Sequence, residues 1–144
     1  MKRILVTMVV MLMAVAAVMA DNRPISLDKL PHKAQTFLKQ YFADSNVSLV
    51  TQDDDLVAKD YEVVLESGTR IDFSPSGDWQ EVEVRQGVVP ASLVPTAIAA
   101  YVKRHYNTER VVRLERDRRN WDVKLSNGLE LTFDKQYRLI DIDD

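Results

Sequence analysis

Twice along the chain, a segment whose hydrophobic residues have the spacing of a helix is followed by segments whose hydrophobic residues have the spacing of β-strands. Segments 30–42 and 94–106 carry apolar residues at i, i+4, i+7 and i+8, which predicts two amphipathic helices, each with one buried stripe. Each segment begins with an aliphatic residue followed by proline. Pro31 and Pro95 suit the first helical turn, because no backbone N–H is needed there. After each helix the period shortens to two, which predicts strands.

A β-hairpin is predicted after each helix. Residues 61–73 (YEVVLESGTRIDF) and 121–133 (WDVKLSNGLELTF) alternate apolar and polar side chains on both sides of Ser67-Gly68 and Asn127-Gly128. These glycines can supply the positive φ angle of a tight two-residue hairpin turn. One further strand is predicted before each hairpin, at 47–52 and 110–116, and another after it, at 79–85 and 138–142.

The pattern predicts an α+β protein made of two tandem α-β-β-β-β repeats, with a period of about sixty residues. The first repeat spans residues 21–85 and the second spans residues 86–144. One such unit is small for an independent core, so we expect the two to share one compact unit. Edge-to-edge pairing would form one antiparallel sheet of up to eight strands with both helices packed on one face. The other face of the sheet would then be open.

The first twenty residues are expected to lie outside the fold. Met1-Lys2-Arg3 is a short basic segment, the run from Ile4 to Ala20 is apolar, and Val18-Met19-Ala20 ends it with a small residue. We predict a secretory signal peptide at 1–20 that is cleaved after Ala20. A membrane anchor is the alternative, although the run is short for a membrane span. Cleavage would place the mature protein in the periplasm without membrane attachment.

The composition narrows the classes of function. The chain has no cysteine, so neither a disulfide nor a lipid anchor at the cleavage site can form. The formal net charge of −3 becomes more negative when the basic leader is removed, which argues against nucleic-acid binding. Residues 110–119 (RVVRLERDRR) concentrate arginines, but no aromatic residue that could stack on bases lies among them. We predict a charged edge strand there.

No motif for catalysis, cofactor binding or metal binding is found. His32 is expected to be exposed, and His105 lies on the apolar stripe of the second helix, which favours a core or boundary position. Two aspartate clusters, at 53–55 and 141–144, lack the alternating ligands, glycine and late glutamate of a calcium loop. A solvated turn and tail are the simpler interpretation, and a weak ion site is the alternative. We expect no enzyme, no cofactor and no metal.

Together these features resemble a known family. The aliphatic-proline helix starts, the paired hairpin pattern and Phe73…Gly77-Asp78-Trp79 are similar to the PepSY-like, β-lactamase-inhibitor-like periplasmic proteins of Bacteroides-type bacteria. The second repeat departs from this pattern, with Tyr137 in place of Gly77 and Leu139 in place of Trp79. The resemblance implies a periplasmic or secreted protein without a cofactor and with an inhibitor-like or protein-binding role.

The last strand of each repeat predicts where a partner would bind. Simple alternation points Val82 and Val84 towards the helices, together with Ile140 and Ile142, and leaves Trp79 on the open face. A large aromatic among charges is typical of a binding hot spot, and coverage of Trp79 by a loop or neighbouring strand is the alternative. The predicted partner-binding face comprises Trp79, Glu81, Glu83, Arg85, Val64, Arg70, Asp72, Lys124, Glu130 and Thr132.

The sequence therefore favours a non-catalytic periplasmic binding or inhibitor-like module that presents an open β-sheet face to a protein or peptide. The alternative is a small-ligand or ion sensor that binds its ligand between the two repeats, and an enzyme comes third. A concave sheet with an exposed aromatic would favour the binding module. An enclosed pocket with convergent polar groups would favour the sensor.

Overall fold

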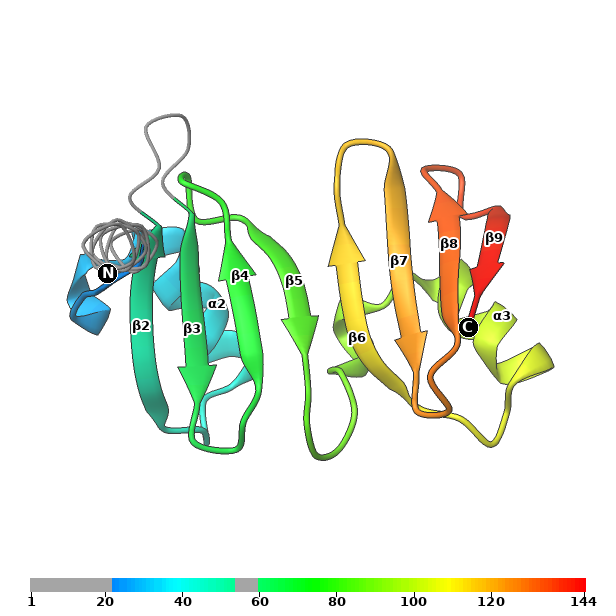
Figure 1. Ribbon diagram of the computed structural model, residues 1–144, viewed down its shortest axis with the longest axis horizontal. Helices are drawn as coiled ribbons and strands as arrows, with labels where there is room; N and C mark the ends of the chain where they lie inside the picture. Colours follow the sequence, from blue (N-terminus) through cyan, green and yellow to red (C-terminus); the bar gives the residue numbers. More distant parts are fainter. Residues whose placement is uncertain (1–21, 54–59) are drawn as a thin grey trace, which may run out of the picture.

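A computed structural model describes residues 22–53 and 60–144 of the chain (Figure 1). The predicted signal peptide with its cleavage after Ala20, and the residues Asp54 and Asp55, lie outside the described residues. Within these two ranges the strands form one sheet of nine antiparallel strands in sequence order, β1 to β9. No helix in this part of the chain is long and apolar enough to span a membrane.

The order of elements repeats along the chain. The first repeat contains the 3-10 helix η1 (Leu27–Lys29), the helix α2 (His32–Tyr41) and the strands β2 (Val47–Asp53), β3 (Tyr61–Leu65), β4 (Arg70–Phe73) and β5 (Trp79–Glu83). The second repeat contains η2 (Ala91–Leu93), α3 (Thr96–His105), β6 (Val111–Arg116), β7 (Asn120–Leu125), β8 (Glu130–Asp134) and β9 (Leu139–Asp143). A short strand that the sequence pattern did not predict, β1 (Asn22–Pro24), pairs with β2.

Both helices lie on the same face of the sheet, so the predicted α+β architecture with two tandem repeats is confirmed (Figure 1). Each helix starts one residue after its proline, which therefore occupies the N-cap position rather than the first turn. The two halves pack alike. The ring of Phe37 in α2 meets Phe73 edge-on at 5.5 Å, and Tyr101 in α3 meets Phe133 in the same way at 5.5 Å.

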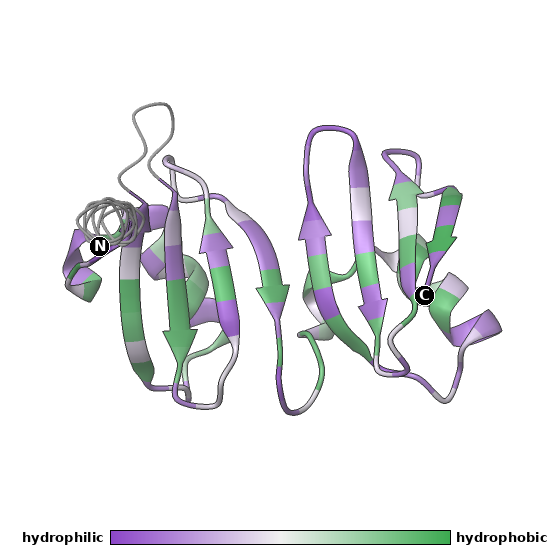
Figure 2. Ribbon diagram, in the orientation of Figure 1, coloured by the Kyte–Doolittle hydropathy of each residue, from purple (hydrophilic) through white to green (hydrophobic). Residues whose placement is uncertain are grey.

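Alternation along the strands separates a dry face from a polar face. Hydrophobic and hydrophilic residues follow one another along the central strands (Figure 2). The helix-facing side chains of the sheet form one core across both repeats, and those without solvent exposure include Val63, Ile71, Phe73, Val82, Leu114, Val123, Leu131 and Phe133. The opposite face carries half-buried polar residues, and neither of the described helices α2 and α3 lies on it (Figure 1).

The hairpin turns are one residue longer than predicted. The N–H of Gly68 donates to the carbonyl of Leu65 at 2.9 Å, and the N–H of Leu65 donates to the carbonyl of Thr69 at 2.8 Å. Three residues therefore form the loop, and the third needs a positive φ angle. Gly68 adopts a φ of 89°, and Gly128 adopts 93° in the equivalent loop of the second repeat.

The second repeat has Tyr137 where the first has Gly77, and this difference changes the contact between the turn before the last strand and the helix of the repeat. A Cβ atom on Gly77 would lie 2.9 Å from the Cβ atom of Pro31, so this turn touches the start of α2 too closely for any side chain. Tyr137 adopts the same left-handed backbone with a φ of 64°, and its ring lies 6.2 Å from that of Trp121. The second repeat thus replaces a close helix contact with an aromatic contact.

A β-bulge overturns the prediction that Trp79 lies on the open face. Asp72 pairs with Glu81 and Phe73 pairs with Trp79, so Gln80 is an extra residue that shifts the alternation by one. Trp79 consequently faces the helix side, as Val82 does. Its side chain is only 8% exposed, and its ring lies 6.2 Å from that of Phe37. The predicted open-face position of Trp79 is wrong.

The same bulge lies in β9, where Ile140 occupies the position of Gln80. Ile140 is 55% exposed and does not face the helices, contrary to the prediction. Ile142 lies opposite the buried Leu131 but is 47% exposed, because β9 is the last strand of the sheet that residues 22–53 and 60–144 form. The arginine-rich strand β6 is also corrected: it lies in the middle of the sheet, between β5 and β7, and is not an edge strand.

Replacing Trp79 with alanine is expected to lower the free energy of unfolding by about 3–5 kcal/mol, because the change opens a cavity beside Phe37. Urea unfolding followed by circular dichroism measures this loss. Ile140→Ala is the control, since this exposed aliphatic side chain should contribute less than about 0.5 kcal/mol. Equal stability of Trp79→Ala and the wild type would show that Trp79 fills no core.

Candidate functional site

Five carboxylates cross the open face in a single row, perpendicular to the strands. Direct cross-strand partners join the residues of this row in the order Glu62, Asp72, Glu81, Glu115 and Asp122, one from each of the strands β3 to β7. Adjacent strands lie about 4.8 Å apart, and like charges placed directly opposite one another destabilise a sheet. We call this set the carboxylate row. Thr132 and Asp141 continue it onto β8 and β9.

A second row of mixed charge runs parallel to the carboxylate row. Its members, again direct cross-strand partners, are Val64, Arg70, Glu83, Arg113, Lys124 and Glu130. This mixed row brings three cations beside the five carboxylates. The open face is therefore strongly charged, with an acidic band beside a band in which both signs are present.

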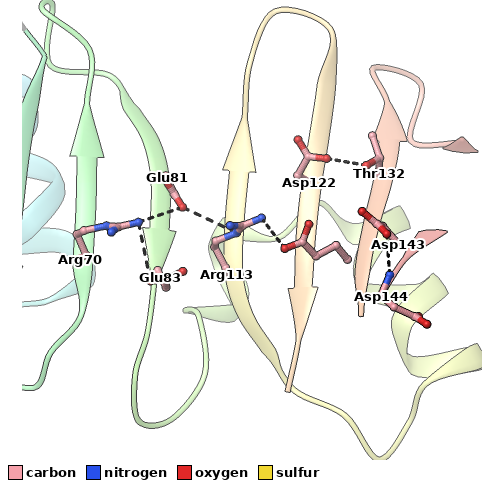
Figure 3. Close-up of polar contacts among 9 residues, drawn as sticks. Arg70, Glu81, Glu83, Arg113, Asp122, Thr132, Asp143 and Asp144 are labelled. Atoms are coloured by element: carbon pink, nitrogen blue, oxygen red, sulfur yellow. Dashed lines mark hydrogen bonds and ion pairs between the residues drawn. The ribbon is translucent and has the colours of Figure 1, made fainter. Parts of the chain in front are cut away.

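Glu81 links the two repeats through two arginines (Figure 3). Its Oε1 accepts a hydrogen bond from Nη2 of Arg70 at 3.5 Å and lies 3.8 Å from Nε of Arg113. Nη2 of Arg113 in turn donates to Oε1 of Glu130 at 3.3 Å. Isolated surface ion pairs contribute little, but this network holds side chains from β4, β5, β6 and β8 in place across the junction of the repeats.

The carboxylate row shifts the ionisation of two of its members. Burial raises the pKa of Asp72 to about 7, and the neighbouring Glu81 and Glu62 add to the shift. Oδ1 of Asp72 is buried and has no hydrogen-bond partner. Burial also raises the pKa of Glu115, again with Glu81 as the second cause. The row thus opposes folding when it is fully ionised, and such unfavourable clusters mark candidate functional sites.

Most of the predicted face does lie on the open side of the sheet. The two rows contain Glu81, Glu83, Val64, Arg70, Asp72, Lys124 and Glu130, and Thr132 donates its hydroxyl hydrogen to Oδ1 of Asp122 at 2.7 Å. Arg85 is exposed at the end of a shallow groove that Val64, Arg70 and Lys124 also line. Trp79 alone lies on the opposite face.

Sequence reasoning missed four members of the face: Glu62, Arg113, Glu115 and Asp122. Their signal was present, since each stands next to a side chain that is fully buried in the core, Val63, Leu114 or Val123. What the sequence did not supply was the register that places Glu115 of the second repeat opposite Glu81 of the first.

Trp79 instead forms part of a cleft of about 610 Å³ on the helix side, beside α2. The guanidinium of Arg116 lies 4.0 Å above the centre of the Trp79 ring, and its Nε donates to the Trp79 carbonyl at 3.0 Å. Phe37 and Tyr41 line the other side, and Lys33 pairs with Asp78 at the rim. Arg116 and the aromatic side chains therefore cover Trp79, which explains its low exposure.

The two histidines lie on the helices α2 and α3 and do not belong to the open face. His105 is exposed and its ring lies 4.3 Å from that of Tyr101, so it is not in the core or at its boundary as predicted. Among the residues that the structure describes, no group of three or more histidines, aspartates and glutamates is placed to hold a metal ion.

The family model described as "Putative beta-lactamase-inhibitor-like, PepSY-like" matches the chain over residues 17–66 and 59–141. Comparison with curated proteins found no match. A protein from Bacteroides thetaiotaomicron, described as a "putative calcium-regulated periplasmic protein", has a similar crystal structure. Its TM-score is 0.83, its sequence is 41% identical, and the match covers 85% of this chain and 97% of that one.

Two proteins of Bacteroides vulgatus are similar over their whole length. One, described as a periplasmic protein of the DUF2874 family, has a TM-score of 0.83 and 39% identity, and the match covers 87% of this chain and 98% of that one. The other, described as a periplasmic protein of unknown function, has a TM-score of 0.81 and 30% identity, with 85% and 99% covered.

The raised pKa of Asp72 predicts that stability falls as pH rises. Between its ordinary value of 3.8 and its folded pKa of about 7, the folded chain holds a proton that the unfolded chain has lost. The free energy of unfolding should therefore decrease from about pH 5.5 to about pH 8. Asp72→Asn should flatten this dependence, whereas Asp141→Asn at the exposed sheet edge should retain it. Urea midpoints across this range test it, and a wild-type midpoint that rises with pH contradicts it.

Proposed function

The chain belongs to the PepSY-like family, and we propose that it is a non-catalytic, inhibitor-like binding module that presents its open sheet face to a protein or peptide partner. We place this activity in the periplasm. Its relatives of known structure are described as periplasmic proteins, and the apolar leader at 1–20 is the expected export signal.

The observation that carries the proposal is the carboxylate row. Five carboxylates stand opposite one another on adjacent strands, and like charges in that arrangement destabilise a sheet. Burial and the neighbouring carboxylates raise the pKa values of Asp72 and Glu115, so ionising the whole row is unfavourable. A partner that brings basic side chains to the row would relieve the repulsion. Electrostatic complementarity of this kind favours fast and selective association.

The layout of the face also supports a protein or peptide partner over a small molecule. The row extends over five strands, or about 19 Å at the usual spacing of strands in a sheet. The Glu81 network holds Arg70 and Arg113 in place before any partner arrives, which limits the entropy lost on binding. The shallow groove that Arg85 lines could receive a side chain of the partner.

Reversing two charges of the row is expected to abolish partner capture. Glu62→Lys combined with Glu115→Lys replaces repulsion within the row by repulsion of a basic partner. The matched control is Asp28→Lys combined with Asp44→Lys, which makes the same change in net charge at exposed positions in and near the first repeat's helices. The mature protein and both variants serve as immobilised bait for periplasmic extract, and bound proteins are identified by mass spectrometry.

The proposal predicts a partner that the wild type and the control retain and the row variant loses, with weaker capture at high salt. A partner that all three proteins retain equally would contradict it. If the row variant loses the partner, cross-linking of the row carboxylates of the wild type to lysines of the partner would locate the contact.

A second candidate function is a cation sensor, and one contact between the repeats favours it. Glu81 and Glu115 face each other across the junction of the repeats, and the similar protein from Bacteroides thetaiotaomicron is described as a "putative calcium-regulated periplasmic protein". Carboxylates are the ligands that calcium prefers, and extracellular sites bind it at about 0.1–1 mM. Repeating the capture with calcium and with a chelator separates the two functions. Binding of calcium that stabilises the wild type, but not Glu115→Gln, would favour the sensor.

A further inference from the structure

The two edge strands of the sheet, β1 and β9, differ in their capacity to pair with a further strand. At one edge, β1 contains three residues including Pro24, and a proline on an edge strand interrupts further pairing. At the other edge, β9 contains five residues and, among the strands that the structure describes, pairs only with β8. Two large aliphatic side chains, Ile140 and Ile142, are about half exposed there, at 55% and 47%.

The internal repeat shows what this edge can receive. β5 is the counterpart of β9, and its outer edge is occupied by β6. There Val82 lies opposite Leu114, Glu83 lies opposite Arg113, and the N–H of Val84 donates to the carbonyl of Val112 at 2.8 Å. The pairing leaves Val82 without solvent exposure and Val84 only 7% exposed.

The corresponding positions of β9 keep the same chemistry but lack the partner. Ile142 stands where Val82 stands and Asp143 where Glu83 stands, each opposite the equivalent residue of its own repeat. The N–H of Asp144, the counterpart of Val84, donates at 2.9 Å to the carboxylate of its own neighbour, Asp143 (Figure 3). An incoming carbonyl can take over this N–H, as the carbonyl of Val112 does in the first repeat.

We propose that β9 binds an extended segment of a partner protein, which adds a tenth antiparallel strand to the sheet. Main-chain hydrogen bonds would supply affinity, and alternate side chains would supply specificity. The segment carries an aliphatic residue opposite Ile142 and a basic residue opposite Asp143, as β6 carries Leu114 and Arg113 opposite Val82 and Glu83.

Charge selects this occupant over a second copy of the chain. Pairing of β9 with another β9 would bring Asp141, Asp143 and Asp144 of both copies together, and like charges opposite one another destabilise a sheet. Pairing with β2 of another copy is blocked by β1, which already covers that strand. A basic segment from a different protein meets neither obstacle. The five carboxylates of the row lie on β3 to β7, and only Asp141, which continues the row, lies on β9. The residues whose amide signals shift therefore distinguish binding at this edge from binding at the row.

The sequence of β6 itself supplies the probe. A capped synthetic peptide with the sequence RVVRLER, residues 110–116, is titrated into the 15N-labelled mature protein, and amide shifts are followed by NMR. We expect shifts concentrated in β9 and β8. A peptide with every charge reversed, EVVELRE, should bind at least about tenfold more weakly. Asp143→Lys should lower the affinity for RVVRLER by a similar factor, while Asp44→Lys, an equal charge change on an exposed loop, should leave it unchanged.

Four outcomes would overturn the proposal. Binding weaker than about 1 mM would show that the edge accepts no such strand. Shifts confined to β5 and β6 would indicate exchange with the protein's own strand, and shifts confined to the carboxylate row would move binding to the open face. A concentration-dependent dimer that Ile142→Lys abolishes would make a second copy the occupant.

Discussion

The pairing of β5 with β6 is the interaction on which the rest of the structure depends. It joins the last strand of the first repeat to the first strand of the second and buries Val82 against Leu114, both without solvent exposure. One helix cannot cover a sheet of nine strands, and neither repeat alone offers a large core. The joint therefore makes one continuous core on the helix side and, on the other side, one continuous charged face.

Continuity of the sheet is also what creates the carboxylate row. Glu62, Asp72 and Glu81 belong to the first repeat, and Glu115 and Asp122 belong to the second, so the row exists only because the register of the joint places Glu81 opposite Glu115. The same register brings Arg113 to Glu81 from the side opposite to Arg70. The ion-pair network thus offsets part of the repulsion at the point where the acidic band crosses the joint. Arg70 and Arg113 also lower the pKa values of Asp72 and Glu115, but burial, followed by the charge of Glu81, outweighs them and both pKa values are raised.

Local patterns predicted most of the fold, and non-local register decided what they missed. The period of the apolar residues located both helices and the strands β2 to β9, but not the short strand β1. Repetition of the pattern established the duplication and placed the helices on one face. The bulge at Gln80 places two polar residues between Trp79 and Val82, which both face the helices, whereas simple alternation assigns these two residues to opposite faces. That single residue moved Trp79 from the open face to the helix side. The carboxylate row was missed for a related reason. Asp72, Glu81 and Glu115 come together only when β4, β5 and β6 pair in the observed register, which the local pattern does not specify.

The central claim is that the carboxylate row serves binding and lowers the stability of the fold. The most direct test is the free energy of urea unfolding of the double variant Glu62→Gln, Glu115→Gln at neutral pH and low salt. Both substitutions keep the size of the side chain and remove charge from positions that lie opposite Asp72 and Glu81. The account predicts a variant more stable than the wild type by about 0.5–2 kcal/mol. A variant less stable by a similar amount would show that these carboxylates hold the sheet together, and would contradict the claim.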